Sequence, residues 1–513
     1  MDISIEQKVI LDETLKDNWD VLIIKGPAGS GKTTLLNEIY QSYNTYKPEY
    51  KIMPGAFTGR ASSVLRTKGL SNAKTVNFWI WGRRSMYKAF NRFFKLELMK
   101  EDRGEEDNEL WIIDESSMLQ ENLLTHLFDH VHNPTRSPKL SLYKAKLEHL
   151  IEDKDFKVKS NKKIIFCGDD NQLPPLFASK GYIKPALNQK MISKLNLNVK
   201  ELNLKMLHRH KYSEDIHKLG FDLENITNNN IKELDFNDYS EKNVSVMEDN
   251  SMKNIIESFK ETFMSSPYQT KYVTYNNQIA HEFNILFRSQ IHDVKLKELL
   301  TEGELINITE NNYFHDLWNG DLIEVTKVGN VIEGPELHVK ASKQKDEKLL
   351  TVDKDISLNF TKINFRNTEN NIEYKDIFIV NQTLNNDDED NWIYINREEL
   401  YFQIEEYMHS FFIYRNPNYS NLEKNDQKKL RETDKYNNAL YVNYAYAMTG
   451  HKSQGGEWDN IFLDLTTVKK DKETNSYKIS KTADQPIGWK YTAATRATNH
   501  ITVIPKRDTL VLT

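Results

Sequence analysis

Short apolar runs followed by glycine or polar residues mark the N-terminal third of this 513-residue chain. They lie at 21–24, 110–113 and 164–167, the last within a strand expected at 163–167, and each has the length of one strand. Continuous apolar runs of this length are typical of parallel strands that are buried on both faces. We expect a helix to begin at 33–36, directly after the first run. The pattern therefore predicts a parallel sheet with helices on both faces.

The second half of the chain starts with a similar pattern. An amphipathic helix is expected at 252–259 and a strand at 271–275. From about 326 to 435, short apolar runs alternate with polar segments, which predicts a β-rich insertion. These runs lie at 337–339, 377–380 and 392–395.

Composition fits a large polar enzyme with several domains. The net charge of -6 gives no global sign of nucleic-acid binding, so such a site must be a local patch. No apolar run approaches the ~20 residues that span a bilayer, and the first residues lack the pattern of a signal peptide. The single cysteine, Cys167, predicts a reducing compartment and is expected to be a buried thiol at a strand end. We expect a cytoplasmic protein without a membrane partner.

A glycine-rich turn directly follows the first apolar run and fits the pattern G-x-x-x-x-G-K-S/T. Its backbone N–H groups and the following helix N-terminus favour phosphate binding. Lys32 is expected to reach the β- and γ-phosphates, and the Thr33 hydroxyl to ligate Mg²⁺. The predicted nucleotide-binding residues here are Gly26, Pro27, Ala28, Gly29, Ser30, Gly31, Lys32, Thr33 and Thr34.

Two further apolar runs deliver polar side chains to the same predicted sheet edge. Asp114 and Glu115 end the second run, where Asp114 would hold Mg²⁺ and Glu115 would orient or deprotonate the attacking water. Gln172 follows the third run and is placed to bond to the γ-phosphate or the water. For Asp114 and Glu115 the alternative is a strand end with a helix cap. For Gln172 the alternative is a proline-stiffened turn.

These segments, in this order, resemble motifs I, II and III of superfamily 1 helicases, and the C-terminal part agrees. The matching segments are 26–33, 114–118 and 168–175, then 449–458 for motif V and 491–497 for motif VI, with 57–61 and 75–77 for motif Ia and its companion. Motif V is similar to that of the RecD and Dda-like branch. The middle of the chain, about 211–436, resembles the family only weakly.

The resemblance assigns roles to residues outside the phosphate loop. It implies that Gln7 reads adenine, that Glu457 contacts the ribose and that Gln454 couples nucleotide to DNA. It also implies catalytic arginines at Arg496 and Arg209, for which the alternatives are a surface ion pair and a helix-end cation. Backbone contacts to DNA are implied for Thr58, Arg60, Thr75, Asn77, Thr449, His451 and Lys452, although the branch often has histidine where Asn77 stands.

A local basic and aromatic patch supports nucleic-acid binding. Between residues 57 and 100 there are ten lysines and arginines, one acidic residue and eight aromatic residues. Cations that neutralise phosphates, together with rings that stack on bases, bind single strands without reading their sequence. For Tyr87, Phe90 and Phe94, at helical spacing, packing in a core is the favoured alternative. The residues leave both readings open for Trp79 and Trp81.

The predicted fold is α/β, with two RecA-like lobes that each carry an insertion. The first lobe would comprise 1–80 and 107–210, interrupted by a wedge segment at 81–106. The second lobe would comprise 211–335 and 437–513, interrupted at 336–436 by the β-rich insertion, which the resemblance makes SH3-like. A lysine-rich segment at about 130–160 receives no role.

The sequence predicts an ATP- and Mg²⁺-dependent helicase. The resemblance implies translocation along single-stranded DNA in the 5′→3′ direction, unwinding of forked duplex DNA, and a phage or bacterial source. One alternative is an RNA helicase or ribonucleoprotein remodeller. Another is an ATP-gated clamp that binds nucleic acid without unwinding it. The sequence identifies no protein partner.

Overall fold

The computed structural model describes most of the chain and divides it into two compact units. The described residues are 3–81, 106–133, 145–173, 184–206, 214–227, 233–239, 242–248, 251–292, 300–312, 314–345, 348–381, 397–465, 469–470, 477–480 and 487–505. Unit 1 comprises 1–82, 100–280 and 447–513, and unit 2 comprises 83–99 and 281–446. The candidate nucleotide site lies in unit 1.

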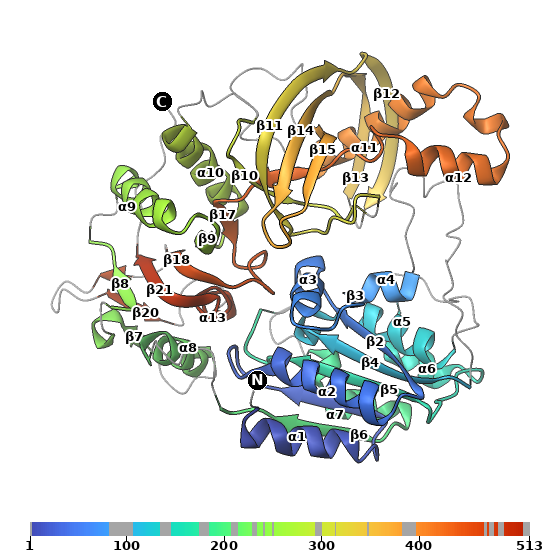
Figure 1. Cartoon of the computed structure of the whole chain (residues 1–513), viewed down its shortest axis with the longest axis vertical. Helices are drawn as coiled ribbons and strands as arrows, with labels where there is room; N and C mark the ends of the chain where they lie inside the picture. Colours follow the sequence, from blue (N-terminus) through green and yellow to red (C-terminus); the bar gives the residue numbers. More distant parts are fainter. Residues whose placement is uncertain are drawn as a thin grey trace. The chain divides into compact units, whose positions relative to one another are not determined.

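The first sheet of unit 1 has six strands, in the order β3-β2-β4-β5-β1-β6, and every pairing is parallel (Figure 1). Its strands are β1 (Val21–Lys25), β2 (Tyr50–Ala56), β3 (Lys74–Thr75), β4 (Asn108–Asp114), β5 (Lys162–Gly168) and β6 (Val199–Asn203). β1 lies between β5 and β6, and β5 lies beside β4. The loops after β1, β4 and β5 therefore lie side by side at the carboxyl ends of these parallel strands.

Helices cover this sheet and close its core. They are α1 (Ile5–Leu15), α2 (Lys32–Tyr46), α3 (Gly59–Thr67), α4 (Val76–Trp81), α5 (Glu121–His132), α6 (Leu147–Glu152) and α7 (Gln189–Ile192), with short 3-10 helices η2 (Ser116–Met118), η3 (Pro185–Leu187) and η4 (Ser193–Leu195). The core packs apolar residues of β1, β4 and β5 against Leu35, Leu36 and Ile39 of α2. Each of these three side chains is fully buried, which fixes the start of α2 against the sheet.

The second sheet of unit 1 is also parallel, with five strands in the order β17-β9-β18-β21-β8. Its strands are β8 (Val244–Val246), β9 (Thr270–Thr274), β17 (Ala447–Thr449), β18 (Trp458–Asp464) and β21 (Ala497–Ile504). The neighbouring elements are α8 (Glu214–Thr227), α9 (Met252–Ser265), α13 (Ile487–Ala494), η5 (Phe236–Asp238), η6 (Pro267–Gln269) and a small sheet of β7 (Glu233–Asp235), β19 (Lys469–Lys470) and β20 (Tyr477–Ser480). The core of this sheet includes Leu173, which follows β5 of the first sheet.

Unit 2 is built on antiparallel strands. Its main sheet has the order β15-β14-β11-β10-β16, and β12 pairs with β13 as a separate hairpin. Figure 1 shows β11 and β14 as long, curved strands. The elements are β10 (Leu305–Ile308), β11 (Leu322–Glu333), β12 (Leu337–Lys345), β13 (Lys348–Ile356), β14 (Asn359–Asn367), β15 (Glu373–Val380), β16 (Val442–Tyr444), α11 (Arg397–Arg415), η7 (Tyr419–Asn421), α12 (Lys424–Thr433) and residues 281–292 of α10 (Asn277–His292).

The predicted α/β fold is confirmed, with parallel sheets in the two halves of unit 1. The strands expected at 21–24, 110–113, 163–167, 271–275, 337–339 and 377–380 and the helix at 252–259 are present. The run at 392–395 lies outside the described residues, as does nearly all of the expected wedge at 81–106. The expected domain boundaries stay predictions. The compact units divide elsewhere, because β10 and β11 belong with the antiparallel strands of unit 2 and residues 397–433 are largely helical.

Candidate nucleotide site

The phosphate loop joins β1 to α2, as the sequence predicts. Gly29 and Gly31 adopt positive φ angles of 83° and 77°, which a residue with a Cβ rarely adopts, so glycine is needed there. A Cβ on Gly26 would lie 2.9 Å from the Cβ of Leu204, which explains the first glycine of the motif. The Lys32 ammonium donates to the loop's own carbonyl oxygens, at 2.8 Å from Gly26 O and 2.9 Å from Pro27 O. These two bonds hold the Lys32 side chain against the start of the phosphate loop.

Two adjacent carboxylates stand at the end of β4. The Thr33 hydroxyl donates to Asp114 Oδ2 at 3.4 Å, and the backbone N–H of Glu115 donates to Asp114 Oδ1 at 2.8 Å. Glu115 has a φ of 51°, an unusual backbone conformation for a residue with a side chain, and such conformations concentrate at functional sites. Burial, and next the neighbouring Glu115, raise the pKa of Asp114 to about 6.

The raised pKa of Asp114 indicates a carboxylate that lacks a sufficient counter-charge. A hydroxyl and a carboxylate are hard oxygen ligands of the kind that Mg²⁺ takes beside substrate phosphates. Thr33 and Asp114 therefore fit the predicted magnesium site. Among the residues that the structure describes, no group of three or more histidine, cysteine or acidic side chains is placed to hold a metal by itself.

Gln172 connects the two halves of the site. With its amide nitrogen turned toward the carboxylate, it donates to Glu115 Oε2 at 3.1 Å and its oxygen accepts from Arg496 Nη2 at 3.1 Å. This orientation satisfies both ends of the amide. Gln172 and Arg496 are each 3% exposed, so Arg496 is a buried residue rather than part of a surface ion pair.

Helix α13 carries three further contacts to the first sheet. The Tyr491 hydroxyl donates to Asp169 Oδ2 at 2.8 Å and accepts from the N–H of Ala28 at 3.3 Å. The next side chain, Thr492, accepts from the N–H of Leu173 at 2.9 Å. The expected coupling residue Gln454 is buried and donates to Leu173 O at 3.4 Å. The phosphate loop and the segment 169–173, here called the β5 loop, are thus both bonded to motif V or VI.

The predicted adenine and ribose contacts differ in exposure. Gln7 lies in a capping box at the start of α1, where its Oε1 accepts from Ser4 N at 2.8 Å. Its Nε2 donates to Gly31 O at 3.0 Å, which brings it to the phosphate loop. Glu457 is exposed. Arg209 lies outside the described residues.

The predicted nucleic-acid residues include several that have local structural roles. Thr58 and Thr75 accept backbone N–H bonds at the starts of α3 and α4, and Thr449 accepts one from Lys452. Asn77 and Lys452 are exposed. Burial lowers the pKa of His451. The Arg60 guanidinium lies over the Trp458 ring, with its carbon 5.0 Å from the ring centre.

The structure resolves one question about the basic and aromatic window. Trp79 is a core residue: it is buried, and its indole N–H donates to Pro54 O at 2.7 Å. The Lys74 ammonium lies 4.3 Å from its ring centre. The side chain of Trp81 and the residues 82–105, including Tyr87, Phe90 and Phe94, are outside the described part of the chain.

Sequence reasoning missed several residues of this site. Tyr491, Thr492 and Asp169 lie inside recognised motifs but received no individual role. Lys184 lies outside every motif, and nothing in its sequence context indicates its contacts. The roles of the predicted residues in binding and hydrolysis remain predictions.

Two other expectations concern the whole chain. Cys167 is buried, as expected, and burial raises the pKa of its thiol. Within the described ranges, no helix has the length and apolar character needed to cross a bilayer.

Comparisons with known proteins found similar sequences and similar structures. The sequence model of the AAA domain family matches residues 2–137, which include the phosphate loop and the Asp114–Glu115 pair. An uncharacterized protein of Methanocaldococcus jannaschii is 30% identical over 206 residues, which are 38% of this chain and 15% of that protein. The chain therefore spans less than a sixth of the length of this relative.

Solved structures of Pif1 helicases are also similar to this chain. The enzyme from Candida albicans has 15% identity and a TM-score of 0.47, and the alignment covers 98% of this chain and 94% of that one. The Bacteroides enzyme in complex with ADP-AlF3 and single-stranded DNA has the same identity and TM-score, with 99% and 94% covered. Over residues 2–137 the chain is therefore similar to the AAA domain family.

Proposed function

We propose that this chain is an ATP-driven motor that translocates along single-stranded DNA and separates the strands of forked duplexes. The observation that carries the proposal is the place of the Gln172 amide: its two ends lie 3.1 Å from Glu115 Oε2 and 3.1 Å from Arg496 Nη2, and it bonds to both when its nitrogen is turned toward Glu115. A binding clamp without hydrolysis would not require a carboxylate, an amide and an arginine to be bonded in series. Such a series supports hydrolysis that is sensed by both sheets of unit 1.

Hydrolysis would use the residues of the first sheet for positioning and electrostatic stabilisation. Phosphate oxygens are stronger acceptors for an ammonium than the neutral carbonyls of Gly26 and Pro27, so Lys32 would turn to the incoming phosphates. Glu115 would accept a proton from the attacking water, and Gln172 would orient that water. Mg²⁺, held by Thr33 and Asp114, would neutralise charge on the β- and γ-phosphates.

Movement along DNA would follow from the bonds between the two sheets. Tyr491, Thr492 and Gln454 attach the second sheet to the phosphate loop and the β5 loop. Loss of the γ-phosphate would alter the β5 loop through Gln172, and these bonds would carry the change to β17. Thr449 ends β17, and His451 follows it, so alternating grip by these residues and Thr58 would move the strand by a short step.

The direction of travel and the nucleic acid are the finer parts of this proposal. We propose 5′→3′ travel on DNA, on the resemblance to the RecD and Dda-like branch. A single assay tests both. Forked and tailed duplexes with a 5′ or a 3′ overhang, made of DNA or RNA, are mixed with the full chain, ATP and Mg²⁺, and strand separation is followed by fluorescence. Lys32→Ala serves as the control without hydrolysis.

Each outcome of the assay has a clear meaning. Separation of 5′-tailed DNA alone supports the whole proposal. Separation of 3′-tailed DNA refutes the direction, and a preference for RNA refutes the substrate. Normal nucleic-acid-stimulated hydrolysis without separation of any duplex favours a clamp or remodeller over a helicase.

A further inference from the structure

Lys184 holds the β5 loop by its backbone. Its ammonium donates to Asp169 O at 3.0 Å, to Gln172 O at 2.7 Å and to Asp170 O. An ammonium has three N–H donors and no acceptor, so all three donors are used by carbonyl oxygens of one short loop. Three fixed acceptors around one donor group define the path of the loop from Asp169 to Gln172.

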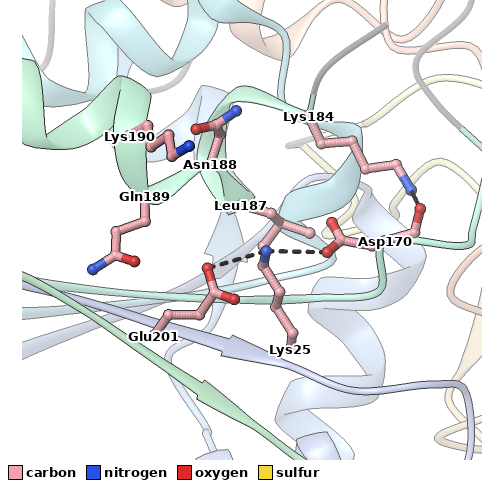
Figure 2. Close-up of a pocket in the computed structure, with 8 residues that line it drawn as sticks. All are labelled: Lys25, Asp170, Lys184, Leu187, Asn188, Gln189, Lys190 and Glu201. Carbon is pink, nitrogen blue, oxygen red and sulfur yellow. Dashed lines mark hydrogen bonds and ion pairs between the residues drawn. The ribbon is translucent and has the colours of Figure 1, made fainter. Parts of the chain in front are cut away.

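The surroundings of Lys184 make this contact costly to lose. Lys184 stands twelve positions after Gln172 and directly before η3. Leu187 of η3 packs closely on Gly168 at the end of β5, since a Cβ on this glycine would lie 3.0 Å from the leucine side chain. The Lys184 ammonium faces a hollow of about 460 Å³ that Lys25, Asp170 and Glu201 also line (Figure 2). Loss of this donor would leave partly buried carbonyl oxygens without a hydrogen bond, which destabilises the loop.

Three other charged side chains around the hollow, Lys25, Asp170 and Glu201, are paired with one another. Figure 2 shows the Lys25 ammonium between two carboxylates, at 3.1 Å from Asp170 Oδ2 and 3.1 Å from Glu201 Oε2. Lys25 therefore cannot replace Lys184 on the backbone of the loop without giving up these ion pairs. Lys190 lines the same hollow from α7 and is exposed.

We propose that Lys184 is a positioning residue for ATP hydrolysis, which sets the place of the Gln172 amide between Glu115 and Arg496 by holding the backbone of the β5 loop. The inference rests on the proposed function, because it assigns Gln172 its role in hydrolysis. The bonds of the Lys184 ammonium go to backbone carbonyls of the β5 loop, whereas the phosphate loop is held by Lys32. Loss of Lys184 should therefore lower kcat and leave ATP binding nearly unchanged, because Lys32 and the phosphate loop are untouched.

The charge of Lys184 gives a second readout. Burial, and to a smaller extent the nearby Lys25 cation, lower the pKa of its ammonium to about 8, whereas Asp169, Asp170 and Glu115 favour the charged form. The other titratable groups nearby are Glu201, paired with Lys25, Lys190 on α7, and Tyr491, bonded to Asp169. Above about pH 8 the amine keeps two donors for three carbonyls, so the hold on the loop weakens.

The test measures DNA-stimulated ATPase of the full chain with Lys184→Met, Lys184→Arg and the matched control Lys190→Met. We expect Lys184→Met to lower kcat about 10- to 100-fold, as small misplacements of catalytic groups do, with KM for ATP within about twofold of wild type. Lys190→Met should behave as wild type. Thermal unfolding of each variant checks that it is folded.

The pH profile keeps the inference testable even where Lys184→Met does not fold. Wild-type kcat should fall above about pH 8, and Lys184→Arg, whose side chain stays charged, should move this fall to higher pH. A falling limb that Lys184→Arg leaves in place would overturn the inference, as would a folded Lys184→Met with normal kcat. If Lys32→Ala also keeps full ATPase, the proposed function itself fails, so the two failures are distinguishable.

Discussion

The predicted nucleotide site and the predicted nucleic-acid contacts differ in how their residues are used within the protein. At the nucleotide site, residues from separate motifs meet: Thr33 contacts Asp114, and Gln172 lies between Glu115 and Arg496. Among the nucleic-acid candidates, Thr58 and Thr75 mainly cap helices, and Arg60 lies on Trp458. The lesson is that convergence of distant motifs supports a shared chemistry, whereas a motif residue with a local partner has an explanation without a ligand.

The largest effect is expected at the nucleotide site, when the phosphate-loop lysine is removed. Lys32→Ala should lower DNA-stimulated ATPase about 1000-fold, because a preorganised cation at a transferring phosphoryl group is lost. Within the described part of the chain its ammonium bonds only to the carbonyl oxygens of Gly26 and Pro27, so the fold should persist. ATPase is measured by phosphate release, and circular dichroism serves as the folding control. Normal hydrolysis by this variant would mean that the site is wrongly assigned.

A second prediction concerns the stability of the nucleotide-free protein. Asp114 has a pKa raised to about 6, so the native state binds more protons than the unfolded state between about pH 4 and 6. The contribution of Asp114 to the free energy of unfolding therefore falls as pH rises through that window. The destabilisation by the ionised carboxylate is complete above it. Asp114→Asn should relieve about 2–3 kcal/mol at pH 7.5, while abolishing Mg²⁺-dependent ATPase.

Thermal unfolding of wild type and Asp114→Asn at pH 5 and pH 7.5, without nucleotide or Mg²⁺, checks this stability effect. The variant should unfold at a higher temperature at pH 7.5, and the difference should shrink at pH 5. A variant that is less stable than wild type at both values would show that Asp114 carries no such cost.

The third prediction sharpens the link between the sheets. Tyr491→Phe removes the hydroxyl that bonds to Asp169 and Ala28 and keeps the buried ring. We expect unwinding to fall about tenfold, as for the loss of one hydrogen bond to a charged group, with a smaller change in ATPase. The ratio of base pairs separated to ATP hydrolysed is the readout. Equal losses of both activities would instead place Tyr491 in hydrolysis alone.

Much of the fold and part of the site could be predicted from the sequence, for identifiable reasons. Buried parallel strands are continuous apolar runs, so β1, β4 and β5 were visible, and the glycines of the phosphate loop have a strict backbone requirement. Lys184 was not visible, because it acts on backbone carbonyls, which carry no sequence signal. The environment of Trp79 was ambiguous, because tryptophan beside lysine occurs both in protein cores and on DNA-binding surfaces. The bond of its indole N–H to Pro54 O identifies it as a core residue.

The smallest expected effect separates the two kinds of nucleic-acid candidate. Lys452 is exposed, so Lys452→Ala should weaken single-stranded DNA binding a few-fold and reduce the slope of log affinity against log salt by about 0.7, the loss of one phosphate contact. The Arg60 cation lies on Trp458, so Arg60→Ala should leave that slope nearly unchanged. Fluorescence anisotropy over a salt series measures both slopes. If Arg60→Ala instead changes the slope as Lys452→Ala does, then Arg60 leaves the tryptophan to bind phosphate, and a local partner in the free protein is no argument against a role in binding.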